Sequence, residues 1–246
     1  MYRDRKHVLR AAREMKGKVL IGHVRWASNP LKLARHELIG TAHTQPFVWR
    51  PASAKATAGT RRSRAVAEAA MARRRLGEGG WIFAHNGTLY IPKEVAARLG
   101  PWEKYIKGKN DSEVLFYWLM KHLARSNNPA QAVRRSIQGI HRIWEGGKRS
   151  YPLHRYPYHG LNWILSDGKT LMAFCYTDPR GFGKSKALCD SRQSYYQLHR
   201  RLATESVVIS SEPFDKESGW TGFRHGELFI ARRQGDGVAT RTVQVL

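Results

Sequence analysis

Residues 85–87, His-Asn-Gly, follow a short apolar run, Trp81–Ala84, in the stretch WIFAHNGTLY. The apolar run predicts a buried strand. Asn-Gly is a strong signal for a two-residue hairpin turn, and a turn is one interpretation of where this strand ends. The other interpretation is chemical, because an Asn side-chain amide beside a Gly backbone N–H can hold the negative charge of an oxyanion. This stretch alone leaves both interpretations open.

Three further polar clusters carry side chains suited to a small charged ligand. GHVRWAS places Arg25 and Trp26 after an apolar segment, and Arg can bind a carboxylate through two hydrogen bonds. AHTQPF contains Pro46, which favours an extended backbone at the residue before it. KNDSE places Asp111 at the start of a predicted helix. Each cluster also has a plain structural interpretation: a surface Arg beside a packed Trp, a loop, and an ordinary helix cap.

The order of the four clusters resembles the class II glutamine amidotransferases, which are N-terminal-nucleophile hydrolases. Arg-Trp-Ala, Gln-Pro-Phe, strand–His-Asn-Gly and Asp-Ser-Glu at a helix start follow one another with suitable spacing. The later stretches LNWILSDGKTLMAF and VVISSEPFD also resemble this family, in particular its small stand-alone members. The resemblance runs from about residue 16 to the end, without residues 50–80. It implies a four-layer αββα sandwich, incomplete at the N-terminus.

The resemblance also implies an activity and roles for six residues. The activity is hydrolysis of the side-chain amide of glutamine, or of a γ-glutamyl amide, to glutamate and ammonia. Arg25 would hold the α-carboxylate of the substrate, and Asp111 its α-ammonium group. Asn86 and Gly87 would form the oxyanion hole. Two further residues would shape and support the pocket: Trp26 and His85.

The family's nucleophile is an N-terminal cysteine whose own α-amine is the general base. This sequence begins with Met1-Tyr2, and Cys175 and Cys189 have no free amine. We therefore expect the nucleophile to be absent from the sequence, together with the strand that carries it. Two interpretations follow: a longer gene product hydrolyses glutamine, or the chain is a truncated and catalytically silent relative. A missing first strand would leave a sheet edge open, which favours poor solubility or a homo-oligomer.

Apolar periodicity predicts an α+β plan in which a helical middle lies between two groups of strands. Helices are expected at residues 3–15, about 92–99, from 111 onward with Asp111 or Ser112 as its cap, and from Pro129. Strands are expected at 18–27 and 81–84, in a hairpin over 162–178 that turns at Asp167-Gly168, and at about 206–210, 226–232 and 239–245. Residues 31–49 are too irregular to assign. Residues 50–80 are expected to be a basic flexible insertion, with a short helix at 63–76, in a single domain spanning residues 1–246.

Composition limits the remaining possibilities. The 246 residues carry a formal net charge of +24 at pH 7. This charge suggests an alternative function, a non-catalytic protein whose basic surface binds an acidic partner such as nucleic acid, although the sequence predicts only non-specific binding. No apolar run is long enough to cross a membrane, and no secretory signal is recognised, so we expect a cytoplasmic protein. The 11 histidines have no metal-ligand spacing, and we expect neither a metal nor another cofactor.

Overall fold

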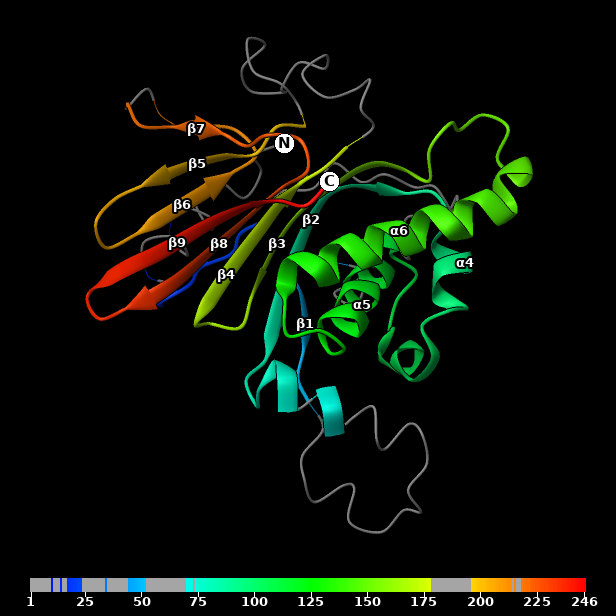
Figure 1. Cartoon of the computed structure of the whole chain (residues 1–246), viewed down its shortest axis with the longest axis horizontal. Coiled ribbons are helices and arrows are strands. Elements are labelled where there is room, and N and C mark those ends of the chain that lie inside the picture. Colours follow the sequence, from blue (N-terminus) through cyan, green and yellow to red (C-terminus); the bar gives the residue numbers. More distant parts are fainter. Residues whose placement is uncertain are drawn as a thin grey trace.

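A computed structural model of the chain describes residues 10, 14, 17–23, 34, 44–51, 70–72, 74–177, 196–213, 215 and 218–246 (Figure 1). Arg25, Trp26 and Cys189 lie outside the described residues. So do most of the helix expected at 3–15 and residues 52–69 of the expected insertion. At the end of that insertion, residues 70–72 and 74–76 are helical, and Ala72 and Leu76 are buried in the main core.

The centre of the fold is a six-stranded antiparallel sheet. Its strands, in spatial order, are β1 (Phe47–Trp49), β2 (Trp81–Leu89), β3 (Tyr158–Ser166), β4 (Thr170–Cys175), β8 (Glu227–Gln234) and β9 (Gly237–Gln244). β1 is short and pairs only with residues Trp81–Phe83 of β2. The remaining half of β2 therefore extends past the end of β1, and the candidate site is built there.

Helices cover one face of this sheet (Figure 1). They are α4 (Pro92–Ala96), the 3₁₀ turn η3 (Gly100–Tyr105), α5 (Asp111–Leu123), α6 (Pro129–Gly147) and the 3₁₀ turn η4 (Lys148–Ser150). α5 is buried along nearly its whole length, and Phe116 stacks on Phe83 of β2 with ring centroids 5.1 Å apart. α6 packs closely on α5 because Gly139 has no side chain; a Cβ there would lie 2.6 Å from the Trp118 ring. The stacking of Phe116 on Phe83 holds α5 against β2, and α6 covers α5 from the other side.

A second, three-stranded sheet lies on the other face of the large sheet (Figure 1). Its strands, in spatial order, are β6 (Val207–Ser210), β5 (His199–Leu202) and β7 (Thr221–Gly222). Between the sheets, Ala173 and Phe229 of the large sheet join Leu198 and Phe223 in a small core. The described residues thus form a helical layer and two antiparallel sheets, which confirms the α+β class. The fourth layer of the expected sandwich stays a prediction, because the described residues show these three layers alone.

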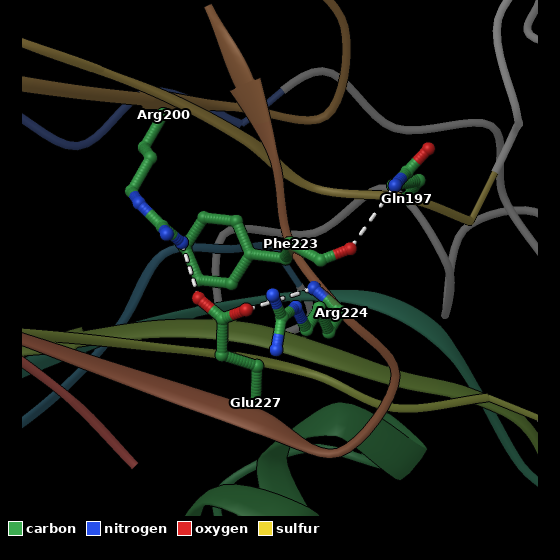
Figure 2. A network of polar contacts seen from close by, with 5 residues as sticks. All are labelled: Gln197, Arg200, Phe223, Arg224 and Glu227. Carbon is green, nitrogen blue, oxygen red and sulfur yellow. Dashed lines mark hydrogen bonds and ion pairs between the residues drawn. The ribbon is translucent and has the colours of Figure 1, made fainter. Parts of the chain in front are cut away.

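One ion pair crosses between the two sheets (Figure 2). Arg200 of β5 contacts the carboxylate of Glu227 at the start of β8, and Glu227 is only 3% exposed. The other carboxylate oxygen of Glu227 accepts a hydrogen bond from the Arg224 N–H at 2.9 Å. The Arg200 guanidinium also lies over the rings of Phe223 and Phe229, 4.9 and 5.2 Å from their centroids. The buried carboxylate is therefore fully partnered, and the pair joins the small sheet to the large one.

Most of the predicted elements are confirmed. β3 and β4 form the expected hairpin, in which the Asp167 carboxylate accepts from the N–H groups of Lys169 and Thr170 and Gly168 has φ of 82°. α6 begins at Pro129, and β6, β8 and β9 occupy the last three expected strands. No described helix has the length and hydrophobicity needed to cross a membrane.

Two details of the prediction are wrong, and one of the two interpretations of Asn86-Gly87 is excluded. Asn110, and not Asp111 or Ser112, is the N-cap of α5, because its side chain accepts from the Ser112 N–H at 2.9 Å. Residues 18–23 of the strand expected at 18–27 are not in a strand. Asn86-Gly87 is not a hairpin turn, because both residues continue β2 and pair with Asn162 and Leu161 of β3.

Candidate active site

The outer edge of β2 beyond β1 is capped by side chains in place of a strand. At one end, the side-chain amide of Gln45 pairs with the backbone of His85: Gln45 Oε1 accepts from the His85 N–H, and Gln45 Nε2 donates to His85 O at 3.0 Å. At the other end, Asp111 Oδ2 accepts from the Leu89 N–H at 2.8 Å. Gly87 lies between these two capped residues. A plain loop was one interpretation of the sequence around Gln45, but its side chain acts here as the next strand would.

The peptide groups of β2 alternate in direction, which places the Gly87 N–H on the same edge. In an antiparallel sheet, the N–H and C=O of one residue point to the strand on one side, and those of the next residue point to the strand on the other side. His85 directs its groups to Gln45 on the outer side, and Leu89 directs its N–H to Asp111. The N–H of Gly87 accordingly points outward, between the Gln45 amide and the Asp111 carboxylate, and not toward β3.

Gly87 is required where it stands, because a side chain has no room there. A Cβ at this position would lie 2.0 Å from Gly160 O and 2.8 Å from Nε2 of His85. Its φ of 157° also belongs to a region that residues with a Cβ rarely adopt. The close approach of β2 to β3 at this point therefore depends on glycine.

Asn86 presents its side chain on the face of the large sheet opposite to α5. Successive side chains of a strand point to opposite faces, and His85, stacked near Phe83, belongs to the helix side. Asn86 is half-buried and pairs with Asn162, whose own side chain bonds Tyr196 O at 2.7 Å and the Tyr176 N–H at 2.8 Å. The Asn86 amide thus lies on the side of the small sheet, one residue from the outward N–H of Gly87.

His85 is 2% exposed, and its ring makes two hydrogen bonds. Nε2 donates to Gly160 O at 3.0 Å, and Nδ1 lies 2.9 Å from Oγ of Ser112. Burial lowers the pKa of His85 to about 4, an effect that the hydrogen bond to Gly160 O only partly offsets. The ring is therefore neutral at physiological pH. This environment suits a supporting residue and not a general base.

Asp111 is the first residue of α5 and is 5% exposed. The N-terminus of a helix stabilises a carboxylate there, because the free N–H groups and the helix dipole are positive at that end. The preceding loop is held by Glu113, whose carboxylate accepts from the N–H groups of Lys107 and Gly108 at 2.9 and 2.8 Å. These contacts hold the carboxylate of Asp111 beside the edge of β2.

Four of the six predicted site residues are thus gathered at one place: His85, Asn86, Gly87 and Asp111. The other two, Arg25 and Trp26, lie outside the described residues. His23 precedes Arg25 by two residues, and its Nε2 donates to His85 O at 3.1 Å. Sequence reasoning missed Gln45 and Ser112. Both belong to clusters that had been recognised, QPF and DSE, and their polar side chains were the available signal.

Cys175 is not suited to be a nucleophile. Its side chain is buried between the two sheets, where burial raises the pKa of the thiol to about 12. A thiol with so high a pKa is protonated at neutral pH, and the thiolate is the reactive form. Among the described residues, no group of three or more His, Cys, Asp or Glu side chains is placed to hold a metal ion.

Comparison with known protein families identifies the class of protein to which the chain belongs. The family model of the class II glutamine amidotransferases matches residues 54–245, so the chain belongs to this family. No curated protein matches the chain.

Solved structures resemble the chain over parts of their length. A glutamine aminotransferase class-II domain protein from Silicibacter pomeroyi is 26% identical, with a TM-score of 0.45, over 65% of this chain and 66% of that one. The glutamine phosphoribosylpyrophosphate amidotransferase of B. subtilis is 17% identical, with a TM-score of 0.46, over 89% of this chain and 33% of that one. A predicted glutamine amidotransferase from Pseudomonas aeruginosa is 17% identical, with a TM-score of 0.44, over 83% of this chain and 68% of that one. The chain thus spans one third of the B. subtilis enzyme and about two thirds of the other two proteins.

Proposed function

We propose that the chain binds glutamine, or the glutamyl part of a γ-glutamyl amide, at the outer edge of β2. Asp111 binds the α-ammonium group of this substrate, and the Asn86 side chain and the Gly87 N–H bind the oxygen of the side-chain amide. Arg25 binds the α-carboxylate, as its position in the RWA motif implies, and Trp26 and His85 shape the pocket. Membership in the amidotransferase family favours this function over the alternative of a basic protein without a catalytic site.

The observation that carries the proposal is the spacing between the Asp111 carboxylate and the Gly87 N–H. Asp111 is bound to Leu89, two residues beyond Gly87 on the same edge of β2. Two residues of a strand span about 7 Å, which is comparable to the distance from the ammonium group of an extended glutamine to its side-chain amide. One substrate molecule can therefore reach both groups at once.

The charges of the site agree with a zwitterionic head group. The N-terminus of a helix favours negative charge, and Asp111 lies there, where a substrate ammonium group can pair with its carboxylate. Two donors directed at one amide oxygen, an amide side chain and a backbone N–H, suit the charge that develops on that oxygen during attack; losing one such donor typically costs about 3–4 kcal/mol. His85 is neutral and fully engaged, so it is not the base.

In this proposal, hydrolysis needs an N-terminal cysteine supplied by sequence upstream of this chain, with its α-amine as the base. The thiolate would attack the amide carbon, ammonia would leave, and water would then release glutamate from the thioester. Without that cysteine, the same site would bind glutamine and be catalytically silent.

The test compares this chain with a form extended upstream to an N-terminal cysteine. We expect the extended form to release glutamate and ammonia from glutamine, and to be modified at that cysteine by an electrophile that mimics glutamine. Cysteine to serine at the first position is the matched control for the labelling. An extended form that is neither labelled nor able to bind glutamine would overturn the proposal.

A further inference from the structure

We propose that Ser112 is a positioning residue for the oxyanion hole, because its hydroxyl is the partner of Nδ1 in the buried His85 ring, and Nε2 of the same ring holds β3 against Gly87. The inference rests on the proposed function for its catalytic meaning. Its structural part, a chain of hydrogen bonds from α5 through His85 to Gly160 and Gly87, is independent of any ligand.

The direction of each hydrogen bond in this chain is determined by chemistry. Gly160 O can only accept, so Nε2 of His85, 3.0 Å away, must carry the proton. In a neutral ring Nδ1 is then an acceptor, and the Ser112 hydroxyl, 2.9 Å away, must donate to it. The hydroxyl oxygen retains lone pairs, and Gln45 Nε2 donates to it at 3.3 Å.

Gln45 completes this series of hydrogen bonds, and the backbone of His85 holds its side-chain amide in one orientation. Its Nε2 also donates to His85 O at 3.0 Å, and its Oε1 accepts from the His85 N–H. The amide therefore cannot turn over without placing a donor against a donor at the His85 N–H. Gln45 thus donates to one lone pair of the serine oxygen, and the O–H of Ser112 donates to Nδ1 of His85.

This series of hydrogen bonds ends in direct contact with Gly87. The hydrogen bond from His85 Nε2 to Gly160 O occupies the space where a Gly87 side chain would be, because a Cβ there would lie 2.8 Å from Nε2 and 2.0 Å from the oxygen. In the other tautomer, the lone pair of Nε2 would face the carbonyl oxygen of Gly160. Repulsion would then move β2 away from β3 at Gly87 and turn its outward N–H.

Consecutive residues of α5 therefore hold β2 on both sides of Gly87. Asp111 binds the Leu89 N–H directly, and Ser112 acts at His85. The same helical turn thus places the proposed ammonium ligand and fixes the proposed oxyanion donor. Sites that need near-attack geometry are sensitive to small displacements, and an error of about 1 Å can lower the rate on the order of a hundredfold.

The test uses Ser112→Ala, with Ser112→Thr as the variant that keeps the hydroxyl. Ser136→Ala is the matched control, because Ser136 is also buried in a helix and its hydroxyl donates to Val133 O at 2.8 Å. Nitrogen-15 NMR of the histidine rings and of the Gly87 amide reports the tautomer and the strand position without any ligand. For the form with an N-terminal cysteine, kcat and KM for glutamine are measured as well.

We expect wild-type His85 to carry its proton on Nε2 alone. Ser112→Ala should remove the donor to Nδ1 and so shift both the Nδ1 resonance of His85 and the Gly87 amide signal, while Ser112→Thr and Ser136→Ala should leave both unchanged. In the active form, Ser112→Ala should lower kcat on the order of tenfold to a hundredfold with a smaller change in KM.

A proton on Nδ1 in the wild type would overturn the inference even if Ser112→Ala does not fold. An unchanged Nδ1 resonance and an unmoved Gly87 signal in a folded Ser112→Ala variant would also overturn it, as would an unchanged kcat in the active form. Failure of the proposed function would show differently, as a wild-type protein that does not bind glutamine while His85 and Gly87 still respond to Ser112.

Discussion

Replacing Gly87 with alanine tests whether β2 and β3 are held in close contact at the candidate site. The new Cβ would lie 2.0 Å from Gly160 O, whereas ordinary contacts begin near 3.4 Å. The strands must therefore separate by about 1.4 Å, which breaks the hydrogen bond of 3.0 Å from His85 Nε2 to Gly160 O. The variant thus combines a steric clash with the loss of a buried hydrogen bond.

The expected cost is large for a single methyl group. A buried donor and acceptor left without partners cost about 1–3 kcal/mol. The backbone of Gly87, with φ of 157°, adds about 1–3 kcal/mol of strain once a Cβ is present. Together these two contributions lead us to expect that Gly87→Ala lowers the free energy of unfolding by about 2–6 kcal/mol.

Urea unfolding followed by tryptophan fluorescence at pH 7 measures this change. Gly146→Ala is the matched control, because Gly146 lies in α6 and a Cβ there would meet nothing within 4 Å. Alanine should be neutral or stabilise that helix by up to about 1 kcal/mol. A Gly87→Ala variant less than about 1 kcal/mol weaker than wild type, with the His85 ring still protonated on Nε2, would refute the reasoning.

Three further predictions concern the rest of the molecule. Arg200→Ala should lower the free energy of unfolding by about 3–5 kcal/mol, because it leaves the buried Glu227 carboxylate without its ion-pair partner. Thermal unfolding measures this loss. The double variant Arg200→Met, Glu227→Leu should recover most of it, because it removes both charges. The pKa of His85 is about 4 in the folded protein, against 6.5 for an unburied histidine, so the unfolded chain binds more protons between these two values. The contribution of His85 to the free energy of unfolding is therefore complete above pH 6.5 and should fall by up to about 3 kcal/mol as the pH falls toward 4. Urea unfolding at pH 7, 5.5 and 4.5 measures this, and an unchanged acid dependence in His85→Asn would contradict it. Cys175 should resist iodoacetamide at pH 8 until the protein unfolds, because burial raises the pKa of its thiol to about 12; rapid labelling of this thiol in the folded state, located by mass spectrometry, would be the contrary result.

Local patterns predicted most of the elements because those elements follow from short-range chemistry. The β3–β4 hairpin carries its own turn in Asp167 and Gly168, and α6 begins at a proline with a good cap before it, Asn128. The turn propensity of Asn86-Gly87 was misleading, because the structure there depends on long-range contacts. This propensity is overridden by pairing with Asn162 and Leu161 of β3, which are distant in the sequence.

The candidate site could be predicted only in part. The order of the clusters indicated His85, Asn86, Gly87 and Asp111, and the structure brings these four together. Gln45 was missed because its role depends on contact with an unpaired edge of β2, which no local pattern reveals. Ser112 was considered only as a cap, although Asn110 caps the helix and leaves the serine hydroxyl for His85.

Binding of glutamine to the wild type and to Asp111→Asn, measured by isothermal titration calorimetry, tests the central claim most directly. Asparagine keeps an oxygen for the Leu89 N–H and removes only the charge, so folding should be preserved. The proposed site predicts measurable binding to the wild type and a loss of at least about tenfold in affinity in the variant, because a charge-assisted hydrogen bond to the ammonium group is removed. Equal affinity of the two proteins, or no binding to the folded wild type, would contradict a glutamine site at the edge of β2.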